Sequence, residues 1–184
     1  STGNRYAVES INKNFRVGFG GLLEKKDGSL WIVEGGNGEL KLITPRRSAG
    51  KVDIANATIK NYNSQNGLPQ RPVGPTVYND QTYFVAGKDS VFVFDEKQDR
   101  FLQDTGNFLS LHLVDNADGT LIFVKDNLGR QWVNLGGGVM VIAPGEAGSE
   151  KIINAPFREL KKNYPVWNIM PSVDKNGQPV VWFF

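Results

Sequence analysis

The chain has 184 residues, of which 40% are hydrophobic and 22% charged, so its composition is that of a globular protein and excludes wholesale disorder. The net charge is +2 and no run of Lys or Arg exceeds two residues, which excludes a strong phosphate-binding stripe and a nucleic-acid partner of that kind. The absence of cysteine excludes disulfides, thiolate nucleophiles and cysteine-ligated zinc within the chain. No apolar run reaches the length of a membrane span, so we expect no membrane insertion by this segment.

A weak internal repeat runs along the chain, and each copy alternates short apolar strands with polar or glycine-rich turns. The copies open with the turns Lys26-Asp27-Gly28-Ser29, Asn79-Asp80-Gln81, Asn127-Leu128-Gly129-Arg130 and Lys175-Asn176-Gly177-Gln178. The strands predicted after these turns are residues 30–33, 82–85, 131–134 and 180–183, and the strands that come next are 40–43, 91–94 and 139–142.

One aromatic residue marks the first strand of each copy: Trp31, Tyr83, Trp132 and Trp182, separated by 52, 49 and 50 residues. A period of about 50 residues with several strands per period is typical of propeller-type arrays. Aromatic side chains at fixed repeat positions could stack on sugar rings, but within apolar strands we expect them to pack between blades.

The fold predicted from this repeat is all-β, with about three and a half antiparallel propeller blades in a single segment spanning residues 1–184. The blade-like repeats cover about residues 15–58, 59–104, 105–150 and an incomplete 151–184. Two arrangements compete: an incomplete arc of a larger propeller, or a small four-bladed ring closed by a strand from residues 1–14. The chain stops within the strand Val-Val-Trp-Phe-Phe, which favours the arc.

The segments between the strands carry little regular pattern. Residues 44–58 and 144–150 contain Pro and Gly and are predicted to be loops between strands or blades. Residues 156–163, between Pro156 and Pro165, allow either one or two helical turns or a loop, and no other segment shows sustained helical periodicity.

Several motifs together resemble the two-component regulator propeller repeats. Residues 26–32 (KDGSLWI) resemble the core of that repeat, residues 66–69 (NGLP) the start of its next blade, and residues 93–101 (VFDEKQDRF) its blade exit. Residues 156–160, 166–169 and 181–183 resemble the last blades of such propellers, so the match covers most of residues 15–184. The chain departs from the pattern at Tyr83, which replaces Trp, and in having a single Gly-Leu-Pro.

This resemblance implies the extracytoplasmic, periplasmic sensor region of a bacterial membrane-bound two-component histidine kinase, often a hybrid kinase that detects oligosaccharides. In that family an immunoglobulin-like domain, a membrane helix and the cytoplasmic kinase follow the propeller, and these 184 residues contain none of them. The chain itself would then be no enzyme, with signalling by a shift between two arrangements of the propeller relative to the next domain.

Catalytic patterns are hard to find in this sequence. His112 alternates with apolar residues, as on a half-buried strand, and no Gly-x-Ser-x-Gly elbow supplies a nucleophile for it. With one His and no Cys, a histidine-ligated zinc site is excluded, and residues 115–119 (DNADG) lack the later Glu of an EF-hand loop. Nothing in the sequence pairs any two of the carboxylates Asp27, Glu34, Asp89 and Asp118 as a glycosidase would require. We therefore expect no catalytic residue, no metal and no cofactor.

Propellers usually meet ligands at loops around one end of the central channel. Two loop types share that end: those after the aromatic strand and those that enter a new blade. The candidate ligand-binding residues on this geometric argument are Asn37, Arg71, Lys88 and Asn134.

The predicted function is therefore sensing of an oligosaccharide or another small ligand. Two alternatives remain open: a propeller glycoside hydrolase or lyase, and a non-catalytic protein-interaction propeller whose exposed edges pair between chains. Self-association as a dimer is also a possible outcome of unpaired edges.

Overall fold

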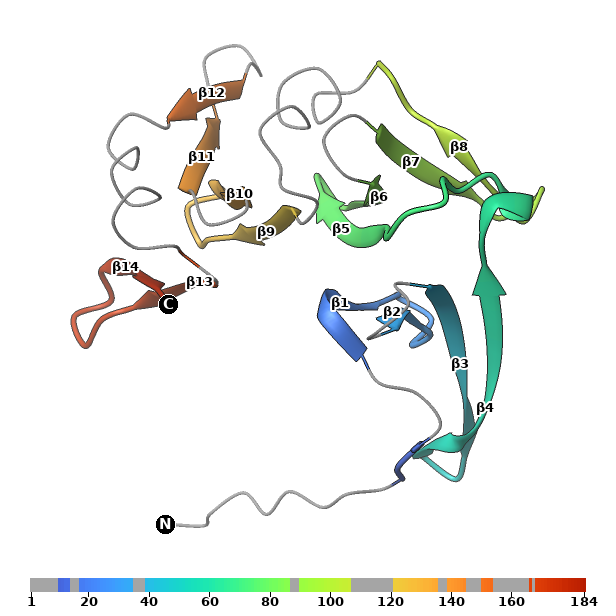
Figure 1. The fold of residues 1–184 in the computed structure, drawn as a ribbon. Helices are drawn as coiled ribbons and strands as arrows, with labels where there is room; N and C mark the ends of the chain where they lie inside the picture. Colours follow the sequence, from blue (N-terminus) through green and yellow to red (C-terminus); the bar gives the residue numbers. More distant parts are fainter. Residues whose placement is uncertain are drawn as a thin grey trace. The chain divides into compact units, whose positions relative to one another are not determined.

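The computed structural model describes residues 10–13, 17–34, 39–86, 90–106, 121–135, 139–144, 150–153, 166 and 168–184. Within these residues the chain is all-β: its strands form four antiparallel sheets, with one short 3-10 turn, η1 (Ser64–Asn66), and no α-helix (Figure 1). The all-β class and the blade-like antiparallel sheets are thus confirmed, whereas a closed propeller is not part of this finding. The chain divides into two compact units, Ser1–Pro75 and Thr76–Phe184, which we take separately.

The N-terminal unit contains a four-stranded sheet whose strands follow one another in chain order. The turn before its second strand is fixed by Asp27, whose carboxylate accepts a 2.9 Å hydrogen bond from the backbone N–H of Ser29. Trp31, Ile32 and Val33 then alternate across both buried faces of that strand. The strands are β1 (Val17–Glu24), β2 (Leu30–Glu34), β3 (Leu40–Ser48) and β4 (Lys51–Tyr62).

The prediction of a loop over residues 44–58 is wrong. β3 continues to Ser48 and β4 begins at Lys51, so most of this segment is a β-hairpin. Ala49 and Gly50 join the strands with positive φ values of 51° and 76°, which suit a tight hairpin turn. Pro45 is tolerated because the register shifts between Thr44 and Arg46, and a bulge does not need its missing N–H.

Side chains of the N-terminal segment cover part of the β4 edge. The Ser10 hydroxyl donates to the Val52 carbonyl at 3.1 Å and accepts from the Ile54 N–H at 2.8 Å. The Asn12 amide donates to the Ile54 carbonyl at 3.2 Å. Backbone groups of an edge strand are thereby satisfied at two consecutive outward-facing positions.

The C-terminal unit contains three sheets, in strand orders β5-β6-β7-β8, β9-β10-β11-β12 and β13-β14. The hairpin between the first two strands turns at Asn79 and Asp80, with φ values of 48° and 61°, as the sequence predicts. The strands are β5 (Gly74–Tyr78), β6 (Gln81–Ala86), β7 (Ser90–Asp95), β8 (Arg100–Gln103), β9 (Leu121–Lys125), β10 (Gln131–Leu135), β11 (Val139–Pro144), β12 (Glu150–Ile153), β13 (Ile169–Val173) and β14 (Pro179–Phe183).

The four sheets follow the predicted repeats closely, but β4 and β12 end a few residues beyond the expected boundaries at 58 and 150. Their organisation as one propeller segment stays a prediction. The expectations for residues 145–149 and 156–163 lie outside the described residues.

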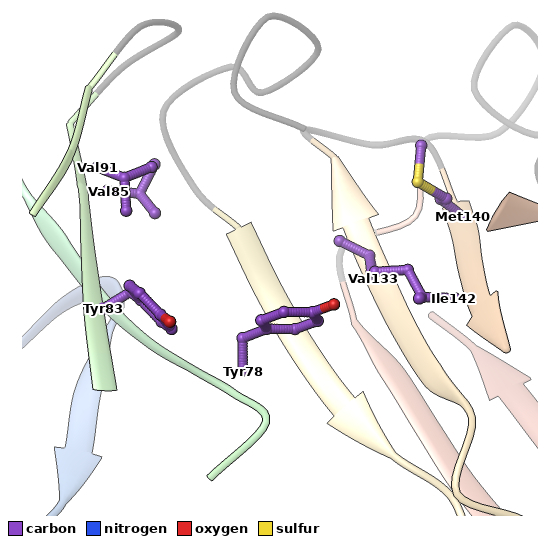
Figure 2. Packing of buried hydrophobic residues seen from close by; sticks show 7 residues of the cluster. All are labelled: Tyr78, Tyr83, Val85, Val91, Val133, Met140 and Ile142. Carbon is purple, nitrogen blue, oxygen red and sulfur yellow. The ribbon is translucent and has the colours of Figure 1, made fainter. Parts of the chain in front are cut away.

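The β5–β8 and β9–β12 sheets pack face to face through a buried apolar cluster (Figure 2). Tyr78 contacts Phe123 of the facing sheet, with ring centroids 5.4 Å apart. The Gln131 amide donates a 3.1 Å hydrogen bond to the Asn79 side chain and so ties the same two sheets together. The cluster consists of Tyr78, Tyr83, Val85, Val91, Val133, Met140 and Ile142.

The other face of the β9–β12 sheet packs on the β13–β14 hairpin. Strand alternation sends Val133 to one face and Trp132 to the other, so both faces of this middle sheet are buried. The Trp132 ring lies 5.9 Å from the ring of Phe183, centroid to centroid. Burial of apolar surface, at about 25 cal/mol per Å2, is the main force that holds these layers together.

Three of the four repeated aromatics are buried as predicted: Trp31 is 2% exposed, Tyr83 8% and Trp132 7%. The prediction is wrong for Trp182, which is 54% exposed. In β14 the neighbours of Trp182, Val181 and Phe183, face the core instead, and alternation turns the indole to the opposite face of the hairpin.

Candidate functional site

A cavity of about 260 Å3 lies in the N-terminal unit, where β4 ends and the chain turns toward β5. It combines apolar and polar lining, which is the usual character of small-molecule sites. The lining residues are Glu39, Leu40, Tyr62, Asn63, Ser64, Leu68, Pro69, Gln70, Arg71, Pro72 and Val73.

One wall of the cavity is a turn held by its own hydrogen bonds. Asn63 and Asn66 form a reciprocal capping box, in which the Asn66 side chain accepts from the Asn63 N–H at 3.3 Å, and the Asn63 side chain also accepts from the Gln65 N–H at 2.9 Å. Gly67 ends η1 at φ 90°, a conformation that glycine adopts without steric cost. The turn is therefore pre-formed rather than dependent on a ligand.

The floor of the cavity is formed by buried side chains. Leu40 and Tyr62 face one another in the β3–β4 register, and both are buried, at 2% and 3% exposure. The Tyr62 ring packs against Trp31 with centroids 5.2 Å apart, and the Lys60 ammonium lies 5.2 Å from the Tyr62 ring centroid. A second wall is formed by the segment from Leu68 to Val73, whose two end residues are buried, at 5% and 2% exposure.

The rim of the cavity is polar. Arg71 and Gln70 are exposed, and the Glu39 side chain is 50% exposed and lies 3.6 Å from the Lys41 ammonium. The Lys41 ammonium also lies 2.8 Å from the Glu34 carboxylate, so this lysine forms ion pairs with two carboxylates. Among the lining residues Glu39 is the single carboxylate, and no histidine is present, so the lining offers hydrogen bonds and charge but not a pair of acid and base groups.

Of the four predicted ligand-binding residues, Arg71 lines this cavity. Asn134 is 5% exposed, and its amide donates a 2.8 Å hydrogen bond to the Val166 carbonyl, so in this structure it joins β10 to the segment before β13. Asn37 and Lys88 lie outside the described residues. Arg71 and Asn134 belong to different units, and the ligand-binding role of all four stays a prediction.

Sequence reasoning missed the other polar lining residues, Glu39, Asn63, Ser64 and Gln70. A signal for part of them exists in the Asn-Gly-Leu-Pro segment, because that turn builds the wall. Glu39 comes from a different hairpin, and only the pairing of β3 with β4 brings it there.

A buried carboxylate in the C-terminal unit also deserves a functional test, because perturbed acids often mark active sites. The Asp126 side chain is 2% exposed and accepts from the Trp132 indole N–H at 2.8 Å and from Arg130 Nε at 2.7 Å. Burial raises the pKa of this carboxyl, but hydrogen bonds from Trp132, Arg130 and the Leu128 N–H outweigh burial and hold the pKa below its usual range. Its partners all come from its own hairpin, so we assign Asp126 a structural role.

The structure adds no site at the other residues that the sequence singled out. His112 and residues 115–119 lie outside the described residues. In the part of the chain that the structure describes, no group of three or more His, Cys, Asp or Glu side chains could hold a metal ion, and no helix is long and apolar enough to cross a membrane.

No protein-family model matches this sequence, and no curated protein matches it. The resemblance to two-component regulator propeller repeats therefore stays a prediction.

Proposed function

We propose that this chain is a non-catalytic, ligand-sensing propeller segment from the periplasmic region of a bacterial two-component histidine kinase. We propose further that it binds an oligosaccharide at the cavity of the N-terminal unit described above. The observation that carries the proposal is the cavity itself, with Arg71 on its rim. The blade-like antiparallel sheets and the repeat motifs support the propeller arrangement.

The chemistry of the lining fits a sugar. Pro69 and Pro72 are at least partly exposed and offer apolar surface to the C–H face of a pyranose ring, while Asn63 and Gln70 can donate to and accept from hydroxyl groups. The volume of about 260 Å3 is just below the range of drug-sized pockets, so we expect one sugar residue of a longer chain to enter.

The binding test is isothermal titration calorimetry of the full chain with a panel of neutral and acidic mono- and oligosaccharides. Arg71→Ala removes a charged donor from the rim, and we expect about a tenfold loss of affinity for any sugar that binds. Arg100→Ala is the matched control, because Arg100 is an exposed arginine on β8 that does not line the cavity.

Two results would overturn the binding proposal: no sugar binding at millimolar concentration, or equal binding by wild type and Arg71→Ala. Release of new reducing ends during the titration would instead identify a glycoside hydrolase or lyase.

The sensor part of the proposal has its own test. An antibody raised against this chain is used to probe membrane and soluble fractions of the source cells. A membrane-bound protein much larger than 20.4 kDa supports a kinase sensor region, and a soluble protein of 20.4 kDa contradicts it.

A further inference from the structure

Two Asn-Gly pairs lie in turns that the structure describes: residues 66–67 in the wall of the cavity, and residues 176–177 in the turn between β13 and β14. In an Asn-Gly pair the asparagine side chain is open to attack by the next backbone nitrogen, because glycine has no Cβ to hinder the approach. A third pair, residues 37–38, lies outside the described residues. The two described turns present the same dipeptide in two different surroundings.

The turn at Asn66 restrains both groups that would react. The Asn66 side chain accepts from the Asn63 N–H at 3.3 Å, and the Gly67 N–H donates to the Ser64 carbonyl at 3.1 Å. Asn66 and Gly67 are partly buried, and the next residue, Leu68, is 5% exposed and anchors the turn to the core. Closure of a ring between Asn66 and Gly67 therefore requires the capping box and a backbone hydrogen bond to break together.

The turn at Asn176 restrains the backbone but not the side chain. The Gly177 N–H donates to the Asp174 carbonyl at 3.0 Å, and the Asn176 backbone N–H donates to the Asp174 carboxylate at 2.8 Å. The Asn176 side-chain amide makes no hydrogen bond to any residue in the described part of the chain, and both Asn176 and Gly177 are exposed. One backbone hydrogen bond is thus the main obstacle to ring closure here.

The sheets that carry the two turns also differ. Within the described residues β13 and β14 form a sheet of two strands with packing on one face, whereas the turn at Asn66 follows β4 of a four-stranded sheet. Local opening costs least where the fewest contacts must break. Opening of the β13–β14 hairpin frees the Gly177 nitrogen, so this turn reaches the reactive arrangement more often.

We propose that Asn176 is a site of spontaneous deamidation, and that the capping box protects Asn66 from the same reaction. The Gly177 nitrogen attacks the side-chain carbonyl carbon of Asn176 and loses its proton, and the side-chain nitrogen leaves as ammonia, which gives a succinimide. Water then opens the ring at either carbonyl and leaves aspartate or isoaspartate. The net reaction consumes one water, releases one ammonia and adds one negative charge to the turn.

Isoaspartate at this position adds a methylene group to the backbone of the turn. The turn is closed by hydrogen bonds from Asp174 N–H to Gln178 O and from Gly177 N–H to Asp174 O, which a longer backbone cannot keep with the same geometry. We therefore expect faster amide exchange in β13 and β14 of the modified chain. The inference does not depend on sugar binding, because the cavity lining contains neither Asn176 nor Gly177.

The test is incubation of the full chain at mildly alkaline pH, followed by peptide mapping with mass spectrometry, in which each deamidated peptide gains about 1 Da. In the folded chain we expect Asn176 to convert at least about tenfold faster than Asn66. In guanidinium chloride the two should convert at similar rates, because the surrounding structure is then absent.

Two variants separate the role of the side chains from that of the dipeptide. Asn63→Ala removes the half of the capping box that the Asn63 side chain supplies, and should raise the rate at Asn66 several-fold without changing the rate at Asn176. Asn176→Gln is the matched control: it keeps an amide, but its longer side chain cyclises far more slowly, so its peptide should gain no mass. Circular dichroism first establishes that each variant is folded.

Three results would overturn the proposal. In the first, Asn66 converts as fast as Asn176 in the folded chain. In the second, Asn176 stays intact in the folded chain while the denatured chain converts there. In the third, the difference between the two sites is equally large in guanidinium chloride, which would assign it to neighbouring residues rather than to the fold.

Discussion

The indole N–H of Trp132 donates a 2.8 Å hydrogen bond to the carboxylate of Asp126, six residues earlier in the chain. The same carboxylate oxygen accepts from Arg130 Nε, and the Arg130 guanidinium lies 5.3 Å from the centroid of the Trp132 ring. A turn residue, a cation and a core aromatic thus form one unit that orients Trp132 toward Phe183.

Replacing Asp126 with Asn removes the charge from this unit. We expect a loss of about 1.5–3 kcal/mol in the free energy of unfolding, because hydrogen bonds to a charged group are stronger than neutral ones. Urea denaturation measures the change. Asp174→Asn is the control: Asp174 accepts two backbone N–H bonds in the corresponding turn of the β13–β14 hairpin but is only partly buried, so its cost should be smaller. Equal costs would contradict the role given to Trp132 and Arg130.

The depressed pKa of Asp126 predicts a pH dependence of stability. Its pKa in the folded chain lies below the ordinary value of 3.8, so the unfolded state takes up the proton first as the pH falls. The stabilisation is complete above about pH 5 and is lost progressively as the pH drops through the folded-state pKa. Urea midpoints between pH 6 and pH 3 should therefore fall more for wild type than for Asp126→Asn. Parallel curves would show that this carboxyl does not contribute.

A single methyl group at position 21 should destabilise the N-terminal unit. A Cβ added to Gly21 would lie 2.5 Å from Cβ and 3.0 Å from the backbone nitrogen of Val33, on the neighbouring strand. Because the obstacle includes backbone, Gly21→Ala should cost about 1–3 kcal/mol, measured by thermal or urea unfolding. Gly74→Ala adds the same methyl group where nothing lies within 4 Å and should cost far less. A neutral Gly21→Ala would refute the packing of β1 on β2.

The two tryptophans of the C-terminal repeats should differ strongly in their effect on stability. Trp132→Ala removes a buried ring and is expected to cost about 3–5 kcal/mol. Trp182→Ala removes a half-exposed ring and should cost less than about 1 kcal/mol. Urea denaturation at a few micromolar compares them, and similar losses would mean that Trp182 is buried in solution.

Strands and turns could be predicted from the sequence because hairpin signals are local. The turns at Asp27-Gly28, Asn79-Asp80 and Gly177 determine where the next strands begin. The structure of residues 44–58 was harder to predict, because Pro45 and the basic residues suggest a loop. The bulge in the β3–β4 register accommodates Pro45 within a strand.

The 50-residue spacing of aromatics failed at Trp182 for a geometric reason. The turns before β10 and β14 share the same backbone hydrogen bonds, from Asp126 N–H to Arg130 O and from Asp174 N–H to Gln178 O. Counting from these turns, Val180 rather than Trp182 occupies the position of Trp132. Both residues lie on the same face of β14, because a step of two residues preserves the strand alternation, and the described packing of the hairpin covers only its other face.

The cavity was only partly predictable. The predicted loop at the entry to a new blade includes Arg71, which lines the cavity. The Asn-Gly-Leu-Pro motif indicates the turn that forms one wall. The floor depends on which residue of β3 faces Tyr62, and that register follows from the whole length of the β3–β4 pairing, including its bulge.

Layered packing in the C-terminal unit also determines the order in which its parts open. The β9–β12 sheet has an apolar neighbour on each face, whereas the described contacts of the β13–β14 hairpin cover one face. Where each layer is held by its neighbours, the free energy of local opening is a sum of nearest-neighbour contacts. Amide hydrogens of β13 and β14 should therefore exchange with solvent well before those of β10 and β11. The hairpin would then open and close many times while the β9–β12 sheet stays folded.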